Sequence, residues 1–344
     1  MESQVISDTS SGPVRIKSRT GLRGLLDRII ATPEGGILIA FILIQIGCIV
    51  AALIFPDSFR YLSPQNIAVM QKAIPTLGIL AIGVGLLMIA GEFDLSVGSI
   101  YIFTSIVAAL LMQAGLTVWI AVPLMVIAGG AISVLNGLIT LRFALPSFIV
   151  SLGAMLFWKG MVFFVHGATS IKFGAPDSFT RFVSGEIGMV QISFIWMIVL
   201  TIVFQVLLRY HRFGNHIYAT GGDRNAALAN GVNPDRVKLI CFGLAGMCAA
   251  FSGMVSAARV GSMTPAAGGG LELQAIAAAV IGGVALTGGR GSMIGVFLGS
   301  CLIYTIQDVL LLMRAPGFYL DIFVGALIVL AAIANNVIAG KGAR

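Results

Sequence analysis

Two carboxylates, Glu92 and Asp94, interrupt an apolar stretch in the segment GEFDLSVGSI at 91–100. Apolar residues fill 74–90 before this segment and resume after it. A carboxylate at bilayer depth is costly unless it faces protein, water or a helix end, so the pair marks a candidate functional site. Two chemistries fit. Asp94 can accept backbone N–H bonds where a broken helix restarts near Ser96, or the pair can carry a proton or sodium ion that drives transport.

The same segment has the features of a broken membrane helix. The glycines at 91 and 98 allow the backbone to turn or to approach a neighbour. Broken helices at membrane depth are tolerated where they line a cavity or pack inside protein, which is where transporters place substrate paths. The candidate path residues are Asp94, Ser96, Ser99, Asn136 and Ser151. For Asn136 and Ser151, packing or capping explains the polar side chain at least as well.

The composition of the chain determines its class. Hydrophobic residues make up 58% of the 344 residues, charged residues make up 10%, and the mean hydropathy is +1.01, which excludes a soluble globular protein. A helix needs about 20 apolar residues to cross a bilayer, so we predict an all-α polytopic membrane protein with about ten transmembrane helices, some broken. The expected spans are 36–55, 66–90, 97–113, 117–140, 146–165, 192–209, 238–258, 272–287, 292–312 and 318–337. If the break at 91–99 or at 287–292 does not cross, the number falls to nine or eight.

Positive charge sets the expected orientation. Of the 21 lysine and arginine residues, 14 fall on one side of the ten predicted spans and 7 on the other, which favours cytoplasmic placement of both termini. Residues 1–30 are polar and basic and are predicted to form a disordered cytoplasmic N-terminus, whereas 31–340 form a single transmembrane domain. Segment 210–237 then lies in the cytoplasm and segment 166–191 in the periplasm. No basic face is interleaved with stacking aromatics, so nucleic acid is not an expected partner.

The segment 210–237 contains a well-specified short helix. Gly221-Gly222 ends the preceding structure, and Asp223 is a good N-cap for residues 224–230, which favour helix. Gly231 supplies a left-handed stop, and Asn233-Pro234 then caps and starts the next helix. A helix of two turns is marginal alone in water and gains stability by docking onto something. An ordinary connector between spans is the alternative. The length of the segment and its two caps favour a helix that docks onto a partner.

Catalytic and cofactor-binding patterns are absent from the sequence. Gly283 and Gly288 have the spacing of a phosphate-binding loop, but Gly289 stands where that loop requires lysine, so we expect a tight turn between two helices. The three histidines and four cysteines do not have metal-ligand spacing, and we expect no metal site and no cofactor in this chain. The cysteines lie in apolar spans and are interpreted as small core residues. An enzyme is therefore not expected.

Four segments resemble the permease subunits of bacterial monosaccharide ABC importers of the ribose, xylose and arabinose type. They are 91–100, 146–160 (PSFIVSLGAMLFWKG), 218–238 and 271–295 (LELQAIAAAVIGGVALTGGRGSMIG), within a resemblance that covers roughly 65–335. The family pattern Gly-Gly-Ile-Asp-Leu-Ser has Glu92 and Phe93 here in place of its second Gly and its Ile. This departure leaves the fold unaffected but puts the exact sugar in doubt.

The resemblance implies a complete transport assembly. It implies a permease domain, surrounded by lipid, that moves a pentose, hexose or related polyol across the bacterial inner membrane. It also implies a second permease subunit, so that the two form a homo- or heterodimer. The other implied partners are a cytoplasmic ATP-binding subunit, which binds the ATP, and a periplasmic sugar-binding protein. It also implies that the region around 221–231 contacts the ATP-binding subunit. The residues assigned to this coupling are Gly221, Gly222, Asp223, Ala226, Ala227, Leu228 and Gly231. The rival hypotheses are an ion-coupled secondary transporter that uses Glu92 and Asp94, and a non-transporting membrane scaffold.

Overall fold

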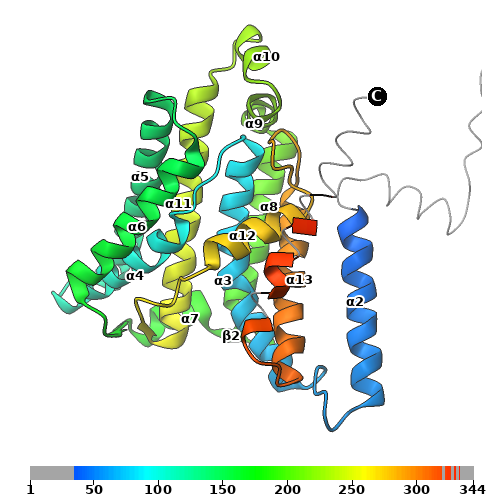
Figure 1. Cartoon of the computed structure of the whole chain (residues 1–344). Helices are drawn as coiled ribbons and strands as arrows, with labels where there is room; N and C mark the ends of the chain where they lie inside the picture. Colours follow the sequence, from blue (N-terminus) through cyan, green and yellow to red (C-terminus); the bar gives the residue numbers. More distant parts are fainter. Residues whose placement is uncertain (1–34, 320–321, 327–328, 331–332, 334–344) are drawn as a thin grey trace, which may run out of the picture.

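The protein folds as a bundle of long apolar helices (Figure 1). The computed structural model describes residues 35–319, 322–326, 329–330 and 333. Within these residues, seven helices are long and apolar enough to cross a membrane, which supports a mostly helical, multi-pass membrane protein. They are α2 (Gly35–Ile54), α3 (Pro64–Ile89), α5 (Val118–Arg142), α6 (Ser147–His166), α8 (Ile192–Tyr210), α11 (Pro234–Val260) and α13 (Met293–Leu312).

Two further apolar helices are shorter than a bilayer-crossing span. α4 (Val97–Gln113) has 17 residues and α12 (Leu271–Ile281) has 11. At about 1.5 Å per residue they measure roughly 26 and 17 Å, less than the hydrocarbon core of about 30 Å. The sequence predicted that the second of these would continue to 287, but it stops at Ile281 because the glycine-rich chain that follows turns repeatedly, with positive φ at Gly283, Gly288, Gly289 and Gly291.

Some expectations lie outside the described residues. They include the predicted disorder of residues 1–30 and the predicted cytoplasmic placement of the two termini. The tenth expected span, 318–337, falls there in part, and its described residues are helical after Gly317.

α3 is the central helix of the bundle. Of its most apolar 18-residue window, 83% is buried, against 11% for the peripheral helices α2 and α6. α8, α11, α12 and α13 pack around α3, and α11 also packs along α5. Small residues allow this close approach, since a Cβ added to Gly246 of α11 would run into the carbonyl of Gly129 of α5. The Gly295–Gly299 pair of α13 likewise packs against α12, within this subunit.

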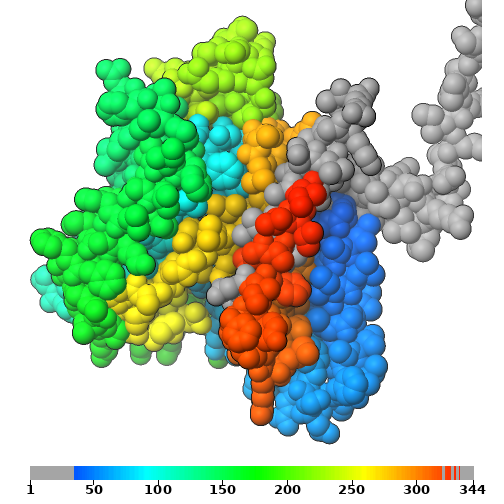
Figure 2. All heavy atoms as spheres, viewed as in Figure 1, coloured from blue at the N-terminus to red at the C-terminus, as the bar shows by residue number. Residues whose placement is uncertain are grey.

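The two ends of the bundle carry different structures (Figure 1). α9 (Arg212–Gly222) and α10 (Arg224–Ala229) lie at the upper end in that view, and Figure 2 shows the yellow-green segment that contains them exposed there. α7 (Asp177–Ser184) and the hairpin of β2 (Glu186–Ile187) with β3 (Val190–Gln191) lie at the lower end. The segments 210–237 and 166–191 thus lie at opposite ends, as the sequence predicted.

A second short pairing connects the lower end to the chain after α11. β1 (Ile171–Lys172) pairs antiparallel with β4 (Ser262–Met263), with Ile171 opposite Met263. The chain from 264 to 270 then leads from β4 back into the bundle, where α12 begins. This pairing fixes one end of a loop that lines the cavity described below.

Candidate functional site

The break between α3 and α4 is anchored to two other helices. Gly91 has φ of 85°, a conformation that glycine adopts without strain. Glu92 forms an ion pair with Lys238 of α11 at 2.5 Å, and both side chains are nearly buried. The backbone N–H of Phe93 donates to Ser147 Oγ at the start of α6, at 3.1 Å. Glu92 is therefore partnered within the chain.

Asp94 is fully buried and accepts three hydrogen bonds. Its Oδ1 accepts from the backbone N–H of Ser96 at 2.9 Å and from Ser96 Oγ at 2.5 Å, and its Oδ2 accepts from Ser133 Oγ of α5 at 2.5 Å. Asn136 Nδ2 donates to Ser96 Oγ at 2.8 Å. Asp94 thus accepts a backbone N–H at the restart of the helix, as predicted, although the N-cap position itself belongs to Ser96.

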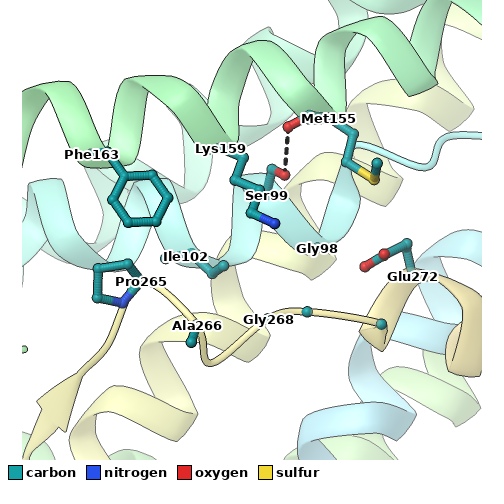
Figure 3. A pocket seen from close by; sticks show the side chains of 12 residues that line it. Gly98, Ser99, Ile102, Met155, Lys159, Phe163, Pro265, Ala266, Gly268 and Glu272 are labelled. Atoms are coloured by element: carbon teal, nitrogen blue, oxygen red, sulfur yellow. Dashed lines mark hydrogen bonds between the residues drawn. The ribbon is translucent and has the colours of Figure 1, made fainter. Parts of the chain in front are cut away.

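A cavity of about 430 Å³ opens beside the N-terminal turns of α4 and α12 (Figure 3). Its walls come from the start of α4, the middle of α6, the loop 265–270 and the start of α12. Ser99 lines it and donates to the carbonyl of Met155 at 2.8 Å. Its size is typical of sites for small molecules.

Four of the five predicted path residues do not line this cavity. Asp94, Ser96 and Asn136 belong to the buried network at the break, and Ser151 is buried in α6, where its Oγ lies 3.3 Å from the carbonyl of Phe148. Only Ser99 of the set lines the cavity. The polar residues of the break act as a connection between α4 and α5 because every one of them bonds to another part of the chain.

Two charged residues that sequence reasoning did not assign to the path line the cavity. Lys159 lies on α6 and Glu272 lies in the first turn of α12, and they extend from different walls (Figure 3). The carboxylate of Glu272 rests against Gly98 of α4, where a Cβ would collide with it. The sequence does contain a signal for both residues, because Lys159 lies within an apolar segment and Glu272 lies at the edge of one. A charge in such a position is costly unless it serves a site.

The capping pattern predicted for the segment 210–237 is confirmed. Asp223 accepts from the backbone N–H groups of Asn225 and Ala226 at 2.8 and 3.1 Å, and Gly231 has φ of 76°. At the next start, the side chain of Asn233 accepts from the N–H of Arg236 at 3.1 Å, with Pro234 at the first position of α11. Gly221 and Gly222 form the last turn of α9, as expected.

The exposed face of α10 differs from the predicted one. The sequence grouped Ala226, Ala227 and Leu228, together with Ala229, as one docking face. In the structure Ala227 is 1% exposed and faces its own chain, whereas Leu228 is 47% exposed and Ala226 is exposed as well. The prediction for Ala227 was wrong because adjacent residues on a helix point about 100° apart. When α10 packs against the rest of the chain, Ala226, Ala227 and Leu228 therefore cannot all face outward. Leu228 is the apolar side chain that remains accessible.

No group of three or more histidine, cysteine, aspartate or glutamate side chains that could hold a metal ion occurs within the described part of the chain. The four cysteines are buried and unpaired, as core residues are. The geometry therefore defines a multi-pass membrane protein with a cavity between discontinuous helices and a short exposed helix at one end.

Comparison with known proteins agrees with this class. The family model described as the permease component of branched-chain amino acid transport systems matches residues 66–332, and the chain belongs to this family. It is 32% identical to the L-arabinose ABC transporter permease of Azospirillum brasilense over 95% of this chain and 92% of that protein. It is 31% identical to the ribose import permease of Bacillus subtilis, covering 80% and 86%. It is 30% identical to the autoinducer 2 import permease of Escherichia coli, covering 80% of each. No solved structure matches the chain.

Proposed function

We propose that this chain is the membrane permease subunit of a binding-protein-dependent importer in the bacterial inner membrane. It translocates a monosaccharide or related polyol with energy from ATP that a partner subunit hydrolyses. The observation that carries the proposal is the cavity at the N-terminal turns of α4 and α12, two apolar helices of 17 and 11 residues. Discontinuous helices that meet at a cavity are the arrangement in which transporters bind substrate. The relatives that import arabinose and ribose support the substrate class.

The lining of the cavity suits an uncharged polyhydroxylated solute. Ser99 supplies a hydroxyl, Lys159 and Glu272 supply one charge of each sign, and the backbone of 268–270 supplies further polar groups. A sugar needs several moderate hydrogen-bonding partners and no strong trap, because binding must remain weak enough for release. We therefore assign Ser99, Lys159 and Glu272 to the path.

The exposure of Lys159 supports a second permease subunit against this face. Lys159 lies within α6, well away from both helix ends, and it is exposed in the single chain. A lysine at this depth is costly in lipid and is found facing protein or a water-filled space. A second subunit that covers α6 would enclose the cavity and keep Lys159 away from the lipid.

The two ends of the bundle suit the two other partners. α10 presents Leu228 and Ala226 for an ATP-binding subunit, and its caps at Asp223 and Gly231 hold it as a preformed helix. At the other end the β2–β3 hairpin exposes Ile187 and Met189, which suit contact with a sugar-binding protein. Both surfaces expose large apolar side chains outside the long helices, which is typical of sites of contact with another protein.

The proposal is tested by reconstitution. The chain is placed in liposomes with its ATP-binding subunit and binding protein, and uptake of labelled L-arabinose and D-ribose is measured. We expect uptake of at least one sugar that requires ATP and both partners. The purified chain alone should hydrolyse no ATP and take up no sugar in a proton or sodium gradient. Gradient-driven uptake by the chain alone would refute the proposal and would favour the ion-coupled transporter.

A further inference from the structure

The end of α9 lies close to two other parts of the chain, the end of α3 and the turn between α12 and α13. The N–H of Gly289, in the turn between α12 and α13, donates to the carbonyl of Ile89 at the end of α3, at 2.9 Å. The hydroxyl of Tyr218 of α9 donates to the carbonyl of Gly291 in the same turn at 2.7 Å. Three segments that are distant in the sequence therefore converge at the end of the bundle where α10 lies (Figure 1).

Glycines occupy the points of closest approach. We call Gly91, Gly221, Gly288 and Gly289 the glycine junction. A Cβ on Gly221 would collide with the carbonyl oxygen of Ile89 and would lie 2.7 Å from the N atom of Gly289. A Cβ on Gly288 would lie 2.8 Å from the Cα of Gly91 and from the carbonyl oxygen of Gly221. These obstructing atoms belong to the backbone, so they cannot rotate away as a side chain can.

The glycine junction is connected to both discontinuous helices that line the cavity. The residues from Gly91 to Ser96 lead directly into α4, and the turn that holds Gly288 and Gly289 follows α12. α9 in turn is joined to α10 through the single residue Asp223. Backbone contacts therefore link the end of α9, one residue before α10, to the chain that leads into α4 and to the chain that follows α12.

We propose that Gly221 is a positioning residue for coupled transport, through which motion of the ATPase-docking helix α10 is transmitted to the cavity. This inference rests on the proposed function, since it requires an ATP-binding subunit that moves α10. Backbone contact is suited to this role because tightly packed segments shift together, whereas long side chains would absorb a small displacement by changing rotamer.

The neighbouring residue supplies a matched control. Gly221 and Gly222 both lie in the last turn of α9, and neither has a positive φ, so alanine changes helix propensity alike at the two positions. A Cβ on Gly222 would have its nearest neighbour, the Cα of Gly289, at 4.0 Å, which is an ordinary van der Waals distance. Gly221→Ala therefore separates α9 from Ile89 and Gly289, and Gly222→Ala does not.

The experiment measures sugar imported per ATP hydrolysed by the reconstituted complex, together with the abundance of the chain in membranes. We expect Gly221→Ala to lower this ratio roughly tenfold, which corresponds to about 1.4 kcal/mol, while ATP hydrolysis continues. Gly222→Ala should leave the ratio unchanged. If Gly221→Ala fails to accumulate, Tyr218→Phe decides, because it removes the bond to Gly291 without adding volume and should also lower the ratio.

The outcomes separate this inference from the proposed function. A wild-type complex without ATP-dependent uptake refutes the proposed function itself. A coupled wild-type complex whose ratio is unchanged in a well-inserted Gly221→Ala protein overturns the inference alone. If Gly221→Ala does not accumulate, an unchanged ratio in the Tyr218→Phe protein overturns the inference in the same way. Equal losses in the Gly221 and Gly222 variants would show that α9 needs its glycines for another reason, and would also overturn it.

Discussion

The exchange of Asp94 for asparagine or leucine distinguishes a structural carboxylate from an ion-carrying one. Oδ1 of Asp94 accepts two bonds from Ser96, and Oδ2 accepts one from Ser133. Asparagine has the same shape and keeps one acceptor oxygen for Ser96. Its NH₂ group then faces the hydroxyl of Ser133, which can rotate to accept instead of donating. All three contacts survive in Asp94→Asn.

The expected costs follow from these contacts. Hydrogen bonds to a charged group contribute about 1.5–3 kcal/mol and neutral ones about 0.5–1.5, so Asp94→Asn should lower stability by roughly 1–2 kcal/mol. Asp94→Leu leaves the Ser96 N–H, the Ser96 hydroxyl and the Ser133 hydroxyl without this acceptor in a fully buried position. Each unsatisfied group costs about 1–3 kcal/mol, so the loss should reach roughly 3 kcal/mol or more.

The assay compares ATP-dependent sugar uptake with membrane abundance and thermal unfolding for both variants. We expect Asp94→Asn to keep most of the uptake, whereas Asp94→Leu accumulates poorly or unfolds at lower temperature. Ser133→Ala, which removes one of the three donors, should lie between them in stability. A well-inserted Asp94→Asn protein that has lost uptake would refute this reasoning, because it would show that the negative charge is required, as in an ion-coupled transporter.

Two further predictions concern the cavity and the docking helix. Lys159→Glu and Glu272→Lys should each lower uptake at least about tenfold, because like charges then face one cavity. The double exchange should restore part of the uptake. A double variant with no more uptake than the worse single variant would contradict a shared site. Leu228→Arg should abolish co-purification of the ATP-binding subunit while the chain remains at normal abundance in the membrane. Ala227→Arg introduces a charge at a buried position and should lower the abundance of the chain itself. Normal abundance of the Ala227→Arg protein would contradict the packing of α10.

Features that depend on near neighbours in the chain could be predicted from the sequence. Asp223, Gly231 and Asn233 were identified as caps because a cap bonds to backbone groups two or three residues away. The bond from Asp94 to the N–H of Ser96 is equally local. Its bond to Ser133, which is 39 residues away, could not be predicted because it depends on how α5 packs.

Helix faces were the main feature that the sequence left open. In a soluble protein an apolar stripe marks the buried side of a helix, but membrane helices are apolar all round because lipid and core are equally nonpolar. The sequence alone therefore determined the membrane class, the positions of the long helices and the caps at Asp223, Gly231 and Asn233. Only the tertiary structure decided that Ala227 faces inward, that Lys159 and Glu272 share one cavity with Ser99, and that four glycines from three segments meet at one point. Each of these depends on contacts between segments far apart in the chain, which local composition does not specify.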